Sequence, residues 1–146
     1  MIAFHVHGLP IAQGSKRVVP TKQGPRVIEG NEAKLRPWRQ EVANVAIEMM
    51  NGERPFSGPV AVRVNFYLPR PRGHFGTGRN EERLRDSAPV APATKPDLDK
   101  LARALLDALT GVAFHDDSQV VSLTTSKLYA DEEKHPGARV EVRQVV

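Results

Sequence analysis

Residues 95–119 read KPDLDKLARALLDALTGVAFHDDSQ, and the spacing of their leucines sets the architecture that we expect for the chain. Steps of three and four residues place apolar side chains on one face of an α-helix. The residues with this spacing are Leu98, Leu101, Leu105 and Leu109. Pro96 cannot continue a preceding helix, Asp97 is a favourable N-cap residue, and Gly111 is a natural stop. We therefore expect a helix over about 98–110.

Aspartates stand at both ends of this predicted helix. Asp97 and Asp99 begin it, and Asp116 and Asp117 precede a segment, 119–129, whose Val, Leu, Thr and Tyr favour a strand. Near a helix cap, where the chain is still extended, two residues two positions apart can turn toward one point. Neighbours on an extended chain face opposite ways, so only one of the second pair joins them easily. We expect Asp97, Asp99 and Asp117 to converge.

Carboxylates held close together repel one another. At about 5 Å and an effective dielectric near 20, each pair costs roughly 3 kcal/mol. A helix N-terminus stabilises each negative charge by only about 0.3–1 kcal/mol, so a divalent cation offsets the repulsion better. Oxygen ligands in a chain without cysteine indicate Mg²⁺, with Mn²⁺ as the alternative, and not Zn²⁺.

Each acidic residue also has an ordinary explanation. Asp97 can serve only as a cap, Asp99 can complement the helix dipole, and Arg103 with Asp107 can form a helical ion pair. The pair at 116–117 can belong to a plain loop. Their density around one apolar helix in a basic protein favours the metal site.

The ordered motifs KPDLDKL (95–101), DALTG (107–111) and DDSQV (116–120) resemble the signature of the RusA family of Holliday junction resolvases from bacteria and their phages. Weaker similarity extends over most of the chain. The resemblance implies a homodimeric, Mg²⁺-dependent endonuclease that resolves four-way DNA junctions by paired symmetric nicks, in recombination and repair or in phage DNA processing. It also implies that the metal-binding aspartates are Asp97, Asp99 and Asp117.

The basic positions within the motifs depart in part from that family pattern. Arg103 stands where well-studied members have a functional lysine, and Lys100 stands where asparagine is frequent. Arginine keeps the charge but cannot transfer a proton, so we expect Arg103 to act in catalysis by clamping phosphate. Lys127 matches a basic position that is often present. A phosphate contact and a solvated strand lysine stay equally open for it.

The composition fits one small nucleic-acid-binding domain over residues 1–146. Net charge is +4, and the seven Lys/Arg of residues 1–40 outnumber two acids, whereas the six of 97–146 are outnumbered by nine. A basic arm and an acidic centre suit a metal nuclease that grips phosphate. No cysteine, signal peptide or membrane-length apolar run is visible. We expect a cytoplasmic protein, bacterial or phage-encoded, with no membrane partner.

A short basic hairpin is predicted where 15–20 and 25–29 frame a turn. We expect DNA contacts from its cations and from three later lysines: Lys16, Arg17, Lys22, Arg26, Lys95, Lys100 and Lys127. The alternative for the hairpin is a charged edge that discourages aggregation of sheets. Residues 69–94 contain Pro, Gly and Arg without periodicity, and we expect a flexible basic flap with a short helical turn near 81–85. A plain disordered insertion is the alternative.

The remaining periodic segments predict the rest of the fold. Strands are expected over 2–8, 60–68 and 138–143, and a helix over about 32–51. The helix should bury one apolar stripe: Leu35, Trp38, Val42, Val45, Ala46 and Met49. The prediction is an α+β domain, with a mixed sheet of about five to six strands and two helices packed on one face, forming a homodimer.

Three other function classes stay open at this point. A nuclease of other branched DNA would use the same residues, and only a panel of substrates separates it. A non-catalytic DNA-binding module predicts no Mg²⁺-dependent nicking. A scaffold for an acidic protein predicts no affinity for junctions even at low salt.

Overall fold

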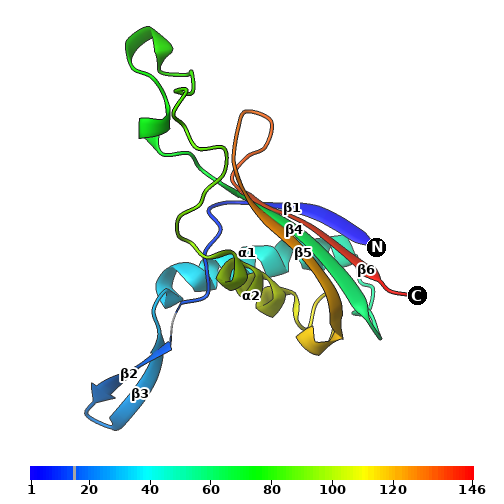
Figure 1. Cartoon of the computed structure of the whole chain (residues 1–146). Helices are drawn as coiled ribbons and strands as arrows, with labels where there is room; N and C mark the ends of the chain where they lie inside the picture. The colour runs from blue at the N-terminus through cyan, green and yellow to red at the C-terminus, as the bar shows by residue number, and fades with distance from the viewer. Residues whose placement is uncertain (15) are drawn as a thin grey trace.

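A four-stranded mixed sheet with two helices against one face forms the body of the protein (Figure 1). The computed structural model describes residues 1–14 and 16–146. The strands are β1 (Ile2–His7), β4 (Val60–Leu68), β5 (Val120–Tyr129) and β6 (Gly137–Gln144). Their order across the sheet is β1-β6-β4-β5, with β4 and β5 parallel and the other pairs antiparallel.

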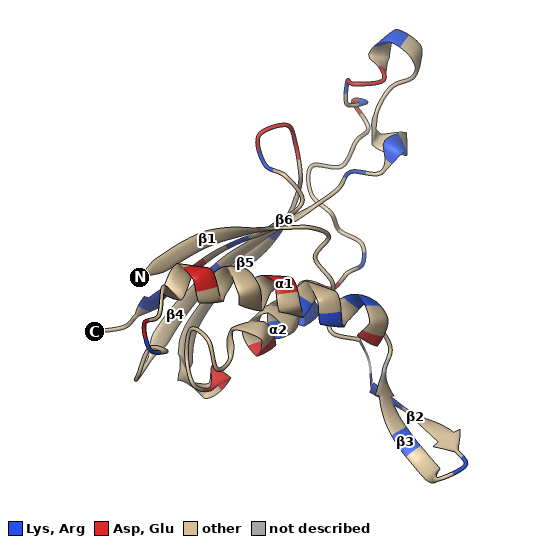
Figure 2. Ribbon diagram, turned by 180° about the vertical axis from the view of Figure 1, so that it is seen from behind, with Lys and Arg blue, Asp and Glu red and all other residues tan. Residues whose placement is uncertain are grey.

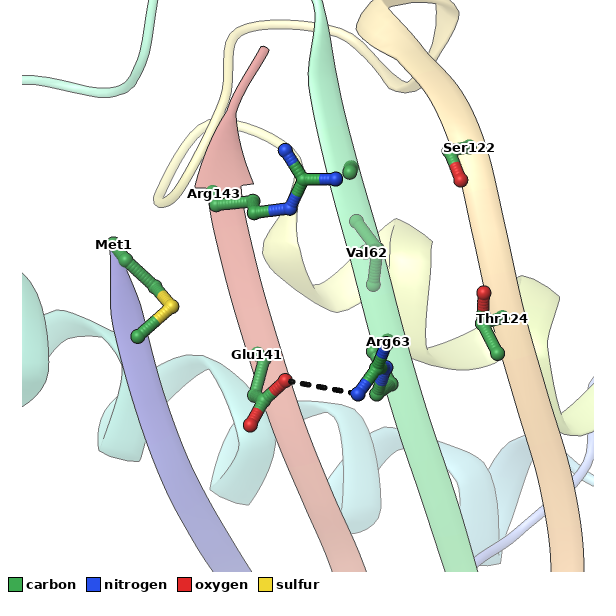
Figure 3. A pocket seen from close by; sticks show the side chains of 8 residues that line it. Met1, Val62, Arg63, Ser122, Thr124, Glu141 and Arg143 are labelled. Atoms are coloured by element: carbon green, nitrogen blue, oxygen red, sulfur yellow. Dashed lines mark ion pairs between the residues drawn. The ribbon is translucent and has the colours of Figure 1, made fainter.

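The predicted alternation of β4 is confirmed. Its four inward residues, Val60, Val62, Val64 and Phe66, are almost completely buried beneath the helices. Residues on the opposite face are more polar, because no helix covers that face in the described part of the chain. Figure 3 shows a shallow hollow there, where Arg63 Nη1 lies 4.0 Å from Glu141 Oε2 beside the hydroxyls of Ser122 and Thr124.

Helix α1 (Glu32–Met50) buries the stripe predicted for it with one difference. Trp38 is 5% exposed and belongs to the core, as expected. Met49, which we expected inside, is 44% exposed, and Met50 is buried instead. The buried stripe continues from Val42 in steps of four residues through Ala46, and the next such step reaches Met50.

Helix α2 (Leu98–Leu109) confirms the helix predicted from the leucine spacing and ends one residue early. Leu101, Leu105 and Leu109 are fully buried, and they pack in the same core as Trp38. Gly111 has a φ of +85°, a conformation that favours glycine, so the predicted stop signal is also confirmed.

The basic hairpin forms β2 (Lys16–Thr21) and β3 (Gly24–Glu29), which pair as a separate two-stranded sheet. The expected single sheet of five to six strands was therefore wrong. After β1 the chain crosses to the first turn of α2, where Gln13 N–H donates to the Lys100 carbonyl at 3.1 Å. The hairpin begins beyond that point and projects from the body (Figures 1 and 2). Ser15, expected at its start, lies outside the described residues.

The segment between β4 and α2 projects from the same end of the body as the hairpin (Figures 1 and 2). It contains 3₁₀ turns at Arg72–His74 and Gly78–Asn80, so the short turn expected near 81–85 lies slightly earlier. Phe75 and Leu84 form an isolated antiparallel bridge within it. In the part of the chain that the structure describes, no helix is both long and apolar enough to cross a bilayer.

Candidate active site

A pocket of about 570 Å³ lies between α2 and the start of β5. Three residues predicted for the active site, Asp99, Arg103 and Asp117, line it together. Its other lining residues are Leu98, Ala102, Leu106, Leu123 and Thr125. The two carboxylates and the guanidinium, which belong to exposed residues, thus border one hollow whose other lining is mostly apolar.

Helical and strand periodicity bring these side chains together. Asp99 lies in the first turn of α2, and Arg103 follows one turn later on the same side of the helix. On β5 the inward-facing alternation places Leu123 and Thr125 opposite them. Asp117 begins the 3₁₀ turn Asp117–Gln119 that leads directly into β5.

The amide side chain of Gln119 fixes the turn that carries Asp117. Its Nε2 donates to the carbonyls of Phe56 and Gly58, each at 2.8 Å. Its Oε1 accepts from the backbone N–H groups of His115 at 2.8 Å and Asp116 at 3.0 Å. The loop from α2 is therefore tied to the chain that enters β4.

Asp116 has a local structural role at the same turn. Its Oδ1 accepts from the backbone N–H of Ser118 at 2.8 Å, which completes a capping box with Gln119. This backbone hydrogen bond lowers the pKa of Asp116 below its ordinary value. Of the two neighbouring aspartates, Asp116 therefore caps the turn and Asp117 lines the pocket.

Asp97 occupies the N-cap position of α2 with extended backbone angles, as predicted. Its side chain nevertheless makes no capping hydrogen bond, and Oδ2 lies 3.8 Å from Lys100 Nζ. It lines a neighbouring pocket of about 640 Å³, together with Arg17, Lys95 and Lys100. The carboxylates of the motif are thus divided between two pockets, one lined by Asp97 and the other by Asp99 and Asp117.

The expected convergence of Asp97, Asp99 and Asp117 on one point is not seen, because Asp97 lines a different pocket from the other two. Among the described residues no three His, Asp or Glu side chains are gathered closely enough to hold a metal. Asp99 and Asp117 share a pocket, however, and neither takes part in an ion pair with a described residue. Asp97 is not used as a cap. Three carboxylates with so few competing partners provide the oxygen ligands that Mg²⁺ prefers.

Two other charged residues of the motif region make structural contacts. Asp107 Oδ2 lies 3.7 Å from Arg39 Nη1 on α1, so the ordinary ion pair considered for Asp107 exists, with a different partner from Arg103. Lys127 Nζ donates to the carbonyl oxygens of Thr94 at 2.7 Å and Pro96 at 2.9 Å. Its ammonium therefore holds the chain that enters α2.

The hairpin cations predicted to contact DNA are spread along β2 and β3. Arg17 reaches the pocket of Asp97, as described above. Lys16 and Arg26 line a hollow at the base of the hairpin with Arg36 of α1. Lys22 lies in the exposed turn between the strands. The structure thus brings Arg17, Lys95 and Lys100 together and leaves the other three along the arm.

Residues 7–143 match the model of the family described as "Endodeoxyribonuclease RusA". This chain belongs to the RusA family. The match covers β4, α2 and β5 together with both projecting arms, so the pocket lies wholly inside the matched region. Membership makes the protein an endodeoxyribonuclease, and the family resemblance found in the motifs is confirmed.

The chain is also similar to "Uncharacterized protein YqaN" of Bacillus subtilis (strain 168). The two are 35% identical over 144 residues, which is 99% of this chain and 96% of that protein. The similarity therefore extends over almost the whole of both sequences.

Sequence reasoning missed two residues that build the pocket. The sequence prediction gave Gln119 no structural role, whereas it forms the hydrogen bonds that hold the turn. The pattern Asp116-x-x-Gln119 is a capping-box signature and offered that signal. Thr125 lines the pocket, and the period-two alternation of the strand could have placed it there.

Proposed function

We propose that this RusA-family endodeoxyribonuclease resolves four-way DNA junctions by paired symmetric nicks, as a homodimer that requires Mg²⁺. The observation that carries the proposal is the pocket that Asp99, Arg103 and Asp117 share between α2 and the start of β5. Acidic side chains at the centre and cations around them suit a scissile phosphate that must be bound despite its charge.

Asp97, Asp99 and Asp117 are the residues that would hold the cation. Bound there, Mg²⁺ would supply Lewis-acid activation of water and would neutralise charge at the phosphate. Arg103 lies within the same pocket, and its guanidinium is suited to clamp phosphate oxygens in the transition state. Thr125 and the apolar floor shape the hollow around the reacting group.

The surrounding cations would hold the DNA backbone. Arg17, Lys95 and Lys100 lie beside Asp97, and Lys16, Lys22 and Arg26 continue along the hairpin. Phosphate contacts of this kind position DNA without reading its sequence. Selectivity for a branched molecule then rests on the relative placement of the arms and the pocket.

The dimer follows from the symmetry of the product. Each chain contributes one such acidic pocket among its described residues, and each pocket makes one nick. Two nicks placed symmetrically in a four-way junction require two pockets related by a two-fold axis. Sedimentation in solution should therefore give twice the chain mass of 16.1 kDa.

The decisive experiment compares a synthetic four-way junction with a linear duplex of the same arm sequence. We expect paired nicks in the junction with Mg²⁺, none with EDTA, and little cleavage of the duplex. Replication-fork and flap substrates complete the panel. Equal cleavage of all of them would replace junction resolution with a broader branched-DNA nuclease activity.

The matched variants are Asp117→Asn and Asp107→Asn. Asp117 lines the pocket, so its variant should lose cleavage by about 10³-fold or more while it still binds the junction. Asp107 lies on α2 but pairs with Arg39, so its variant should keep most of the activity. Full cleavage by Asp117→Asn would refute the assigned site.

A further inference from the structure

One face of the hairpin carries an exposed ridge of apolar side chains. Val18 lies directly opposite Val27, and Pro20 directly opposite Pro25. Residues opposed in an antiparallel pair point to the same face, and positions two apart on one strand do so as well. The four therefore form one surface, which we call the apolar ridge. Val18 is 66% exposed and Val27 62%, and both prolines are exposed.

The described part of the chain leaves the ridge mostly exposed, although Val27 also borders the hollow between the hairpin and Arg36. Figures 1 and 2 show the hairpin extending away from the sheet and helices in both views. An isolated two-stranded hairpin is marginally stable in water. Its exposed aliphatic pairs add little stability, because they bury little apolar surface. A partner that covers the ridge would therefore gain the apolar contact.

The charge of the hairpin identifies that partner as nucleic acid. The strands and their turn contain Lys16, Arg17, Lys22 and Arg26 against a single acidic residue in the sequence, Glu29. Arg17 lines the pocket of Asp97 from the opposite face of the hairpin, so the strands that carry the ridge adjoin the proposed DNA-binding surface. An apolar protein surface would leave these cations without counter-charges.

We propose that the apolar ridge is a wedge that inserts between bases at the branch point of bound DNA. The proposal rests on the proposed function, because it takes branched DNA as the ligand. Apolar side chains on DNA-binding arms, proline among them, unstack base steps while neighbouring cations hold the phosphates. Proline loses no side-chain freedom on insertion, and valine loses little. Bases at a branch are also less firmly stacked than bases within a duplex.

The test uses a four-way junction with 2-aminopurine beside the branch point, because the fluorescence of this base rises when it is unstacked. The wild-type protein and Val18→Thr/Val27→Thr are added to saturation in EDTA, so that the DNA stays uncut. Threonine keeps the β-branched shape and removes the apolar tip. Val121→Thr, at an equally exposed valine on β5, is the matched control.

We expect the wild type and Val121→Thr to raise the fluorescence equally. The rise with the double variant should be about threefold smaller or less, with its affinity for the junction changed by less than about threefold, because phosphate contacts dominate binding. An undiminished rise with the double variant, or no rise with the wild type at saturation, would overturn the wedge.

Two further measurements separate this inference from neighbouring ideas. Sedimentation of the free double variant should match that of the wild type; a changed oligomeric state would make the ridge a contact between copies and overturn the proposal. Cleavage with Mg²⁺ is measured on unlabelled junction. A wild type that cuts the junction without unstacking the probe refutes only the wedge, and one that unstacks the probe without cutting refutes the nuclease assignment.

Discussion

The ammonium of Lys127, on β5, is hydrogen-bonded at 2.9 Å to the carbonyl oxygen of Pro96, the residue immediately before Asp97. A second bond, at 2.7 Å, reaches the carbonyl of Thr94. Lysine has three donor hydrogens, and two of them are thus directed to the chain that enters α2. This geometry links the strand that follows Asp117 to the position of Asp97, at the opposite end of the motif.

Lys127→Met should therefore lower cleavage by about ten- to a hundredfold, because a small displacement of aligned groups is costly to catalysis. Binding should change little. The slope of log affinity against log salt decides between two roles: it stays unchanged if Lys127 positions the loop, and it falls by about 0.9 if Lys127 contacts a phosphate. Lys134→Met, in the turn between β5 and β6, is the control for loss of one surface lysine.

Gln119→Ala should destabilise the fold. Four hydrogen bonds disappear, and the partly buried carbonyl of Phe56 loses a donor, so the free energy of unfolding should fall by about 2–4 kcal/mol. Urea denaturation measures this. Gln144→Ala is the matched control, since Gln144 Nε2 makes one exposed bond, to the Ser57 carbonyl at 2.6 Å. Equal losses in the two variants would contradict a special role for Gln119.

Stability should depend on pH through His5. Burial, followed by repulsion from His7, Arg139 and His135, lowers the pKa of His5 below its ordinary value. The pocket around it also contains Tyr67, Glu133 and Lys134. The unfolded histidine takes up its proton near about pH 6.5 and the folded one only at lower pH, so the unfolded state binds more protons in between.

The contribution of His5 to the free energy of unfolding should consequently be fully present above about pH 7 and should be lost as the pH falls through that window. Denaturation series at several pH values should give a shallower pH slope for His5→Gln than for the wild type. His74→Gln, in the segment between β4 and α2, serves as the comparison. An identical slope for His5→Gln and the wild type would show that His5 is not responsible.

The sequence predicted the parts of the fold that depend on local periodicity. The leucines of α2 and the alternation of β4 specify buried faces, and both were confirmed. The hairpin was also predicted, but its separation from the main sheet depends on where the segment before it docks, through contacts such as Gln13 with Lys100. Residue spacing does not encode such a distant contact.

The candidate site divides in the same way. Asp99 and Arg103 share a helix face by spacing alone, whereas Asp117 joins them only because Gln119 ties its turn to Phe56, 63 residues away along the chain. Lys127 shows what the sequence alone does not predict. A strand lysine near a nuclease motif suggests a phosphate contact, and only the folded chain reveals two carbonyl oxygens within its reach.

The segment between β4 and α2 offers a final test of how the two arms share the DNA. Its base is anchored: Arg70 lies over the Tyr129 ring at 4.3 Å from the centroid, and its Nη1 donates to the Pro89 carbonyl at 2.8 Å. Arg85 Nε donates to the Phe75 carbonyl at 2.7 Å. Two of its arginines therefore make internal contacts, and three others remain as candidates for phosphate: Arg72, Arg79 and Arg83.

Replacing residues 75–87 with a short Gly-Ser linker retains Arg70, Arg72 and Pro89 and removes the tip with its two candidate arginines. If the tip closes over the junction, the complex should dissociate faster, and the salt slope should fall by about 0.9 for each phosphate that the arm no longer neutralises. Arg79→Gln/Arg83→Gln, which keeps the tip, should reproduce the change in salt slope. Dissociation rates and salt slopes equal to those of the wild type in both variants would show that the hairpin and the residues around Asp97 bind the DNA without this arm.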